Sequence, residues 1–597
     1  MLPTPQKTCQ RDRITLRSQR KGVMLDLLIR GGTLIDGTGA EGRRADVGIR
    51  DGRVVAVGKC GEPARRTLDA TGLVVAPGFI DIHTHYDAQL FWDPAASPSP
   101  LYGVTTIVGG NCGFSIAPLR PEATDYLRRM LAKVEGMPLE SLEAGLPWDW
   151  TSFGDWLSRL DDRVVLNAGF LVGHSALRRV VMGQAAVGET ANEAQLAEMV
   201  SVLHQALEQG GLGFSSSRAP THNDGDGNPV PSRFATDEEI VTLAGVTRDH
   251  AGTTLEYIPT VGAFQEQHME LMTAMSLAAN RPLNWNVLQP SSLLPELHVS
   301  QLAASDHAAQ RGARVVALTL PQVMTVRLNF RSGFVLDAFP GWAQTLALPL
   351  PERIRALQDP EIRSQLKQGA ESEQAGPLRV LSHWKRMTIA ETFEPANQGL
   401  VGRTLGEIAA ERGRDPFDVL LDLAVSEDLR TSFTPFIPGD DEKSWRLRAQ
   451  VWRDPRTLIG ASDAGAHLDM TDGFQYTSWL LGTAVRERGL LALEEAVQKL
   501  TDAPAALYGI RDRGRIAEGV HADLVLFDAE RIAPGPLQTR SDLPANAARL
   551  YAEPEGIEHV FVNGTEIVSG KNFTGAQPGT VLRSGRDTET VEIPGGR

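Results

Sequence analysis

Two histidines, His83 and His85, stand one residue apart at the end of a short apolar stretch, residues 79–82. The breaker Pro77-Gly78 precedes this stretch, which predicts a short buried strand. Alternate residues of a strand point to the same side, so both imidazoles would face the space beyond the strand's end. Two imidazoles held side by side make half of a metal site. The pattern therefore indicates binding of a divalent metal ion.

Other residues that can bind a metal or move a proton lie at the ends of further apolar runs. Cys112 follows the run 105–108, Glu256 lies in the run 253–257, and Asp463 follows the run 458–462. A thiolate suits zinc because the metal keeps it deprotonated, and a carboxylate can both contact a cation and accept a proton. His467, four residues after Asp463, either supports the site or lies on a helix surface.

The run that ends at Ser217 carries the groups that would recognise a substrate. Ser216, Arg218 and His222 lie at its end. A guanidinium can bind a carboxylate through two parallel hydrogen bonds, so Arg218 would hold the carboxylate of an acyl amino acid. The alternative is an internal salt bridge with Asp224 or Asp226 in the loop that follows.

Three more polar residues end or interrupt predicted strands. His174 follows the run 164–172 and either lines the pocket or is a hydrogen-bonded core histidine. Asn284 and Asn286 alternate in the run 283–287, and a neutral amide is a poor ligand for a transition metal. We therefore predict that these asparagines orient substrate or solvent.

The elements that must position these residues follow two patterns. Residues 24–76 alternate short apolar runs with Asp-Gly turns, which predicts a small β domain too short to bury its own core. Residues 513–597 again read as strands and turns and are expected to complete it. Residues 77–512 alternate strand and helix patterns, as a parallel α/β fold requires. Within them, 330–455 is predicted to be an insertion near the site, made of proline-broken helical pieces.

Composition limits the classes of function. A formal charge of −15 over 597 residues argues against nucleic acid as a partner, because a phosphate backbone needs a basic face. No apolar run is long enough to span a bilayer. Three cysteines cannot form a disulfide framework, so a reducing, cytoplasmic location is expected. Residues 1–23 are basic but lack the apolar segment of a secretory signal, which favours a disordered extension or a misassigned start over a transit peptide.

The stretch 78–87, Gly-Phe-Ile-Asp-Ile-His-Thr-His-Tyr-Asp, resembles the first-strand signature of the amidohydrolase superfamily. The stretch 103–118, with Gly-Gly-Asn-Cys-Gly at its centre, resembles the second-strand segment of the N-acyl-D-amino-acid deacylases, or D-aminoacylases. Shorter stretches at 134–138, 148–153, 173–178, 512–514 and 542–544 agree, and the resemblance covers about residues 25 to 585. It implies an α/β fold: a (β/α)8 TIM-like metallo-hydrolase barrel beside a small β-sandwich built from both chain ends.

The resemblance also implies roles for particular residues. Cys112 would be a metal ligand in place of the carboxylated lysine of hydantoinases. Asp463 would contact the metal, take the proton of the attacking water and deliver it to the leaving nitrogen. The implied cofactor is zinc, one or two ions per chain, with manganese or iron as alternatives. The implied partner is a small-molecule amide with a linear C–N bond, with no nucleic acid and no membrane, and such barrels commonly form homo-oligomers.

The sequence departs from this family at two strands. The typical deacylases carry a histidine on the fifth strand and another on the sixth, whereas this chain has Glu256 near the first position and no histidine at the second. Either Glu256 supplies an oxygen ligand and one metal sits among His83, His85, Cys112 and Asp463, or a second metal site is weak. Two other functions stay open: hydrolysis of a cyclic amide, an imide or an aryl-amide xenobiotic, and a metal-free relative that acts as a binding protein.

Overall fold

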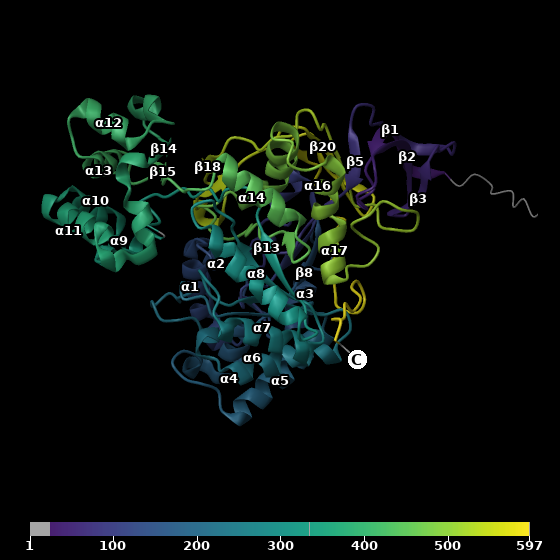
Figure 1. The fold of residues 1–597 in the computed structure, drawn as a ribbon, viewed down its shortest axis with the longest axis horizontal. Helices are drawn as coiled ribbons and strands as arrows, with labels where there is room; N and C mark the ends of the chain where they lie inside the picture. The colour runs from purple at the N-terminus through teal and green to yellow at the C-terminus, as the bar shows by residue number, and fades with distance from the viewer. Residues whose placement is uncertain (1–23, 334, 596–597) are drawn as a thin grey trace, which may run out of the picture.

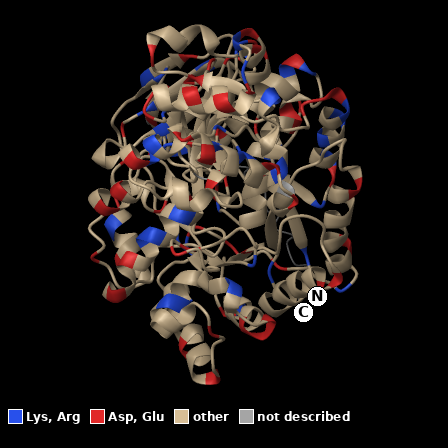
Figure 2. Ribbon diagram, turned by 90° about the vertical axis from the view of Figure 1, so that its left-hand side faces the viewer, with Lys and Arg blue, Asp and Glu red and all other residues tan. Residues whose placement is uncertain are grey.

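The computed structural model of the chain describes residues 24–333 and 335–595, so the predictions for residues 1–23 lie outside the described residues. The described chain has mixed α/β content, as expected. Among the described residues, no helix combines the length and apolar character needed to cross a membrane. In Figure 2 acidic and basic residues are interspersed along the ribbon.

Parallel strands carry the predicted site residues. Every pairing among them is parallel and follows chain order, in a three-stranded and a six-stranded sheet. An isolated parallel bridge between Thr84 and Ala464 brings the ends of the first and last strands together. The strands are β6 (Phe79–Asp81), β7 (Val104–Gly109), β8 (Asn167–Phe170), β9 (Val172–Gly173), β10 (Gly213–Ser217), β11 (Thr254–Ile258), β12 (Leu283–Leu288), β13 (Val315–Thr319) and β16 (Thr457–Ile459).

Helices follow several of these strands and cover their outer side. Figure 1 shows α4 (His174–Met182), α5 (Glu193–Glu208), α6 (Asp237–Val246) and α7 (Glu266–Ala279) grouped in the lower part of the view. Capping fixes where such helices begin: the Asn192 side chain accepts the Gln195 N–H at the start of α5. Every residue of β10, β11 and β13 is buried, as expected for parallel strands that are covered on both faces, and β13 has a correspondingly apolar sequence.

A second, nine-stranded sheet is built from two distant parts of the chain. In it, β5 pairs with β1 on one side and with β17 on the other. Only Gly78 separates β5 from β6, and a Cβ at this glycine would lie 2.2 Å from the Thr105 side chain. The sheet is therefore joined directly to the first site-bearing strand. Its strands are β1 (Leu25–Leu34), β2 (Arg43–Arg50), β3 (Arg53–Gly58), β4 (Ala64–Asp69), β5 (Val74–Pro77), β17 (Leu524–Phe527), β20 (Ile557–Val562), β21 (Thr565–Ser569) and β22 (Asn572–Phe573).

Between β13 and β16 the chain forms a helical lobe with its own core, which we call the lobe and define as residues 328–433. Trp342 and Phe417 lie at the centre of that core. In Figure 1 the lobe projects from the body at the left, and α14 (Glu442–Arg453) leads back to the body. The remaining elements of the lobe are α9 (Trp342–Leu346), α10 (Leu350–Gln358), α11 (Pro360–Glu371), β14 (Thr388–Glu391), α12 (Leu405–Arg412), α13 (Pro416–Ser426) and β15 (Ser432–Thr434).

Candidate metal and catalytic site

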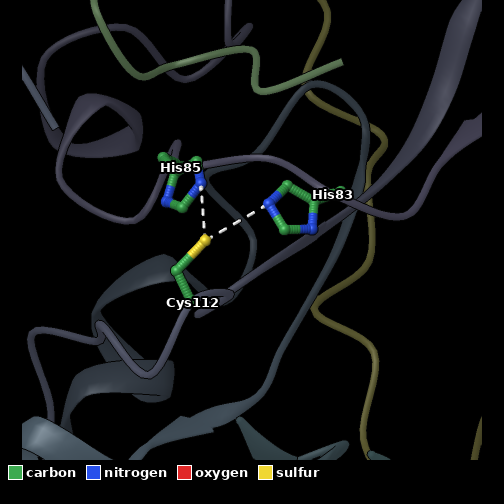
Figure 3. Close-up of side chains that lie close together, drawn as sticks. All are labelled: His83, His85 and Cys112. Atoms are coloured by element: carbon green, nitrogen blue, oxygen red, sulfur yellow. Dashed lines mark hydrogen bonds between the residues drawn. The ribbon is translucent and has the colours of Figure 1, made fainter. Parts of the chain in front are cut away.

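His83, His85 and Cys112 meet at the carboxyl ends of β6 and β7 (Figure 3). The Cys112 Sγ lies 3.4 Å from the His83 Nε2 and 3.8 Å from the His85 Nε2. Their possible ligand atoms all lie within 4.8 Å of one another, and all three residues are buried. The two imidazoles come from one strand end, as the His-x-His spacing predicts.

The turn after β7 brings the thiol to the histidines. Gly110 has a φ of +72°, and a Cβ there would lie 2.1 Å from the Leu171 carbonyl oxygen, so only glycine fits. Cys112 itself has a φ of +60°, Asp463 of +59° and His467 of +48°. Such conformations are costly for residues other than glycine and tend to persist at functional sites.

Asp463 adds a carboxylate whose two oxygens face different histidines. Its Oδ1 lies 3.0 Å from the His85 Nε2 and 3.7 Å from the His83 Nε2, while its Oδ2 lies 3.7 Å from the His467 Nε2. The Asp463 N–H donates to the His83 carbonyl oxygen, which ties the end of β16 to the end of β6. His467 thus lies beside the candidate catalytic carboxylate.

Two glutamates complete the surroundings. The Glu256 Oε2 on β11 accepts the Cys112 N–H at 2.8 Å, and its buried Oε1 has no hydrogen-bond partner among the described residues. The Glu135 Oε2 lies 3.3 Å from the His85 Nδ1. We call His83, His85, Cys112, Glu256 and Asp463 the metal cluster.

Glu135 was not predicted as a site residue. The stretch 134–138 contributed to the family resemblance, but nothing in its spacing connects it to a strand end. A buried carboxylate beside a histidine is a structural observation that the sequence pattern could not supply.

Burial and neighbouring charges shift the pKa values of all five residues of the metal cluster. Burial raises the pKa of Glu256 to about 8, and burial with the neighbouring Glu256 raises the pKa of the Cys112 thiol well above its usual range. Burial lowers the pKa of His83 to about 3. Burial opposes charge on His85 as well, but Glu135 and Asp463 outweigh it and raise its pKa to about 10.

Asp463 behaves differently from the other carboxylates. Burial works against its ionised form, yet the hydrogen bond and positive charge of His85 outweigh burial and hold its pKa below the usual range. A divalent cation among these groups would favour the thiolate and the ionised carboxylates together.

The donor set fits such an ion. Two imidazoles, one thiol and one or two carboxylates are the ligands that zinc and related transition metals take in proteins. The unpartnered, fully buried Glu256 Oε1 supplies a further donor.

The two asparagines of β12 differ in surroundings. The Asn286 Nδ2 lies 3.0 Å from the His83 Nε2, so this side chain borders the metal cluster. The Asn284 Nδ2 donates to the Leu255 carbonyl oxygen and to the Tyr508 hydroxyl, which are interior groups. The prediction that both orient substrate or solvent has direct geometric support only at Asn286.

Behind β10 lies a buried hydrogen-bonded group that we call the β10 network, consisting of His174, Arg178, Ser216 and Glu239. The His174 Nδ1 lies 2.8 Å from the Ser216 Oγ, and its Nε2 lies 2.8 Å from a Glu239 oxygen. Arg178 donates to both Glu239 oxygens at 2.6 Å. His174 therefore has the contacts of a hydrogen-bonded core histidine, which was the alternative to lining the pocket.

Arg218 and His222 follow β10 and lie nearer to the surface. Arg218 donates to Asp237 and to the Ala235 carbonyl oxygen, so its ion-pair partner is neither Asp224 nor Asp226. The His222 Nδ1 lies 2.8 Å from the Ser217 Oγ. Burial lowers the pKa of His222 to about 3, and the negative charge of Asp463 opposes this shift.

Comparison with known proteins gives one consistent answer. A family model described as amidohydrolase family matches residues 66–568, and one described as urease alpha-subunit, N-terminal domain, matches residues 6–79. The D-aminoacylase of Alcaligenes xylosoxydans xylosoxydans is 31% identical to this chain over 95% of this chain and 99% of its own length.

Two solved structures are similar over nearly the whole chain. One is N-acyl-D-glutamate deacylase from Bordetella bronchiseptica, complexed with zinc and a phosphonate inhibitor that mimics the tetrahedral intermediate. It has a TM-score of 0.63 and 25% identity and covers 94% of this chain and 100% of its own. The other is a D-aminoacylase studied for its binuclear metal centre, with a TM-score of 0.61, 28% identity and the same coverage.

Proposed function

This chain belongs to the amidohydrolase family, and from that premise we propose that it is a metal-dependent hydrolase that cleaves a linear amide C–N bond of N-acyl-D-amino acids. The observation that carries the proposal is the convergence of His83, His85, Cys112 and Asp463 at one point of the fold. The relatives named above are deacylases of D-amino-acid derivatives, which supports this substrate class.

We propose zinc as the metal, held by His83, His85, Cys112 and Asp463, with Glu256 as a further oxygen ligand in place of the fifth-strand histidine. The similar deacylase from Bordetella bronchiseptica binds zinc, and the thiol favours zinc over magnesium or calcium. A carboxylate in the set also admits manganese or iron. A binuclear centre is described for the similar D-aminoacylase, whereas the missing sixth-strand histidine favours one tightly held ion here.

The bound ion would act as a Lewis acid, which lowers the pKa of a water molecule and polarises the scissile carbonyl. Asp463, ionised and 3.0 Å from His85, is placed to accept a proton from the attacking water and to return it to the leaving nitrogen. Asn286 and His222 border the same space and would orient the substrate. Ser216, Arg218 and His174 would act indirectly, by fixing β10 and the loop after it. The products are a carboxylate and an amine.

We further propose that the parallel strands close into a (β/α)8 barrel. Pairing follows chain order within each of the two parallel sheets, and only Leu171 separates β8 in one sheet from β9 in the other, so these two segments count as one barrel strand. The Thr84–Ala464 bridge and the placement of the site at the carboxyl strand ends also support closure. In this reading residues 77–512 are the catalytic barrel with the lobe as its main insertion. Residues 24–76 and 513–597 then form the second, β domain.

A second candidate function, hydrolysis of a cyclic amide, an imide or an aryl amide, is favoured by one observation. Asn284 and Asn286 stand on the strand where the typical deacylases carry a histidine, which changes the wall of the site.

A substrate panel tests these functions on protein purified without added metal. It contains N-acetyl-D-leucine, N-acetyl-L-leucine, a hydantoin and an N-acetyl aryl amine, and metal content is measured in parallel by plasma mass spectrometry. Hydrolysis of the D-amino-acid derivative together with bound metal supports the first proposal, and turnover of only the hydantoin or aryl amide supports the second. Absence of metal and of all turnover after zinc addition would contradict both and favour a binding protein.

A further inference from the structure

Glu135 carries a buried carboxylate on the far side of a metal-cluster histidine. Its Oε2 lies 3.3 Å from the His85 Nδ1, whereas the His85 Nε2 faces the Cys112 Sγ at 3.8 Å and the Asp463 Oδ1 at 3.0 Å. The imidazole ring therefore separates Glu135 from the other members of the cluster. Glu135 is 3% exposed and His85 is also 3% exposed, so water does not compete for this contact.

The backbone fixes this glutamate from two directions. Glu135 caps the carboxyl end of α1 (Thr124–Val134), where its N–H donates to the Leu131 carbonyl oxygen. Its own carbonyl oxygen accepts the His467 N–H. Gly136 follows with a φ of +57°, and a Cβ there would lie 3.1 Å from the His467 Cα. The end of α1 is thus packed against the segment that carries Asp463 and His467.

We infer that Glu135 is a positioning residue that selects which nitrogen of His85 can bind the metal, an inference that rests on the proposed function. An ionised carboxylate 3.3 Å from Nδ1 can accept a hydrogen bond and cannot donate one, so it favours the tautomer of a neutral imidazole with its proton on Nδ1. The lone pair of Nε2 then points toward Cys112 and Asp463. Partners that orient a metal-binding histidine in this way change metal affinity by about 10–100-fold when they are removed.

Glu135 has two alternative roles, as a direct metal ligand or as a purely structural residue, and each predicts a different result. A direct ligand would need an oxygen on the Nε2 side of His85, where Cys112 and Asp463 lie, but the Glu135 Oε2 is on the Nδ1 side. A purely structural role would stabilise the fold with or without metal. The positioning role predicts an effect on metal affinity that exceeds any effect on the stability of the metal-free protein.

The test compares Glu135→Ala and Glu135→Gln in the full chain, with Glu140→Ala as the control. Glu140 is an exposed glutamate in the first turn of α2 (Leu139–Gly145), five positions along the chain. Zinc affinity is measured by competition with a chromophoric chelator. The thermal unfolding temperature of each metal-free protein and the absorption spectrum of each Co²⁺ derivative are recorded as well.

We expect Glu135→Ala to weaken zinc affinity about 10–100-fold and to alter the Co²⁺ spectrum. Glu135→Gln should weaken affinity less, because its amide oxygen still accepts the Nδ1–H, and Glu140→Ala should match the wild type. The metal-free Ala variant also loses the contact between Glu135 and His85, and the positioning role predicts that this loss of stability is smaller than the loss of zinc-binding free energy.

Three results would overturn the inference: unchanged zinc affinity in Glu135→Ala, a Gln variant as weak as the Ala variant, or affinity loss matched by an equal loss of metal-free stability. A wild-type protein that binds no zinc would instead overturn the proposed function itself, so the two failures are distinguishable.

Discussion

The metal cluster and the β10 network are both buried and both rich in charged groups, yet their charges are balanced differently. In the β10 network, Arg178 and His174 converge on the single carboxylate of Glu239. Burial alone would raise the pKa of Glu239, but the hydrogen bonds from His174 and Arg178 outweigh it and lower that pKa. This part of the molecule supplies its own counter-charges.

In the metal cluster only Asp463 is held ionised, by His85, whereas burial raises the pKa of Glu256 and of the Cys112 thiol. Glu256 and Cys112 lie side by side with pKa values shifted upward by burial, and a buried oxygen of Glu256 has no partner among the described residues. The comparison shows that burial of polar groups does not by itself mark a functional site. What distinguishes the metal cluster is that burial shifts Glu256 and Cys112 toward their neutral forms, whereas the carboxylate of the β10 network is held ionised by its neighbours.

The largest expected effect is on catalysis at the metal cluster. Asp463→Asn keeps the shape of the side chain but removes its ability to take a proton, so kcat should fall about 10²–10⁴-fold. Steady-state kinetics on N-acetyl-D-leucine measures this, with metal content determined on the same sample. A variant that keeps its metal and loses less than tenfold in kcat would show that another group moves the proton.

Breaking the β10 network should affect folding and leave the metal alone. Arg178→Met leaves Glu239 buried without its main counter-charge, which should lower the free energy of unfolding by about 3–5 kcal/mol. Denaturant unfolding measures this loss. Arg159→Met is the matched control, because the Arg159–Asp149 pair is about half exposed and should contribute less than about 1 kcal/mol. Loss of zinc in Arg178→Met at temperatures where it is folded would contradict the separation of the two regions.

A smaller effect is expected on the pH dependence of stability without metal. The pKa of Glu256 is about 8 in the folded protein, above its ordinary value, so the folded state holds this proton more tightly than the unfolded state. The stabilisation that Glu256 contributes is therefore present below about pH 4.3, the ordinary value for a glutamate, and is lost as the pH rises toward 8.

Thermal unfolding of the metal-free protein at pH 5, 6, 7 and 8 tests this direction. The wild type should lose several degrees more than Glu256→Gln over this range, and zinc should stabilise the wild type most at the highest pH. Parallel curves for the two proteins would show that Glu256 stays ionised without metal.

The smallest effect is expected at Arg218, the residue that follows β10. Because Arg218 already donates to Asp237 and Ala235, Arg218→Gln should change KM for N-acetyl-D-leucine less than threefold and stability by under about 1 kcal/mol. A KM increase of tenfold or more with kcat unchanged would instead show that the guanidinium leaves Asp237 to bind the substrate carboxylate.

The sequence predicts which residues come together when each of them directly follows a strand. The end of a parallel strand is fixed by its apolar run, so His83, His85, Cys112 and Asp463 could be assigned to one place before any coordinates were known. Membership in the amidohydrolase family, expected from the motif at 78–87, is confirmed by the family match over residues 66–568.

The same reasoning failed where the contact depends on how helices and loops pack. Glu135 sits at the end of a helix, and nothing in its local sequence reveals that it reaches His85. The ion-pair partner of Arg218 could not be predicted from the sequence either. Asp237 lies at the start of α6, and not in the loop that follows β10. Asn284 and Asn286 are the same residue type on one strand, so the sequence does not distinguish them. In the structure Asn284 donates to the Tyr508 hydroxyl, whereas Asn286 borders His83.

The position of β5 has a consequence for how the chain is made. The ribosome synthesises β5 and its neighbour β1 early. The other edge of β5 pairs with β17, which is synthesised only after residue 523. Until then β5 presents an open edge, a known starting point for aggregation. Gly78, at the junction with β6, also donates to the Asp523 carbonyl oxygen, so this junction gains its hydrogen bond at the same late moment. A message truncated before β17 would therefore yield a chain in which this edge of β5 stays open.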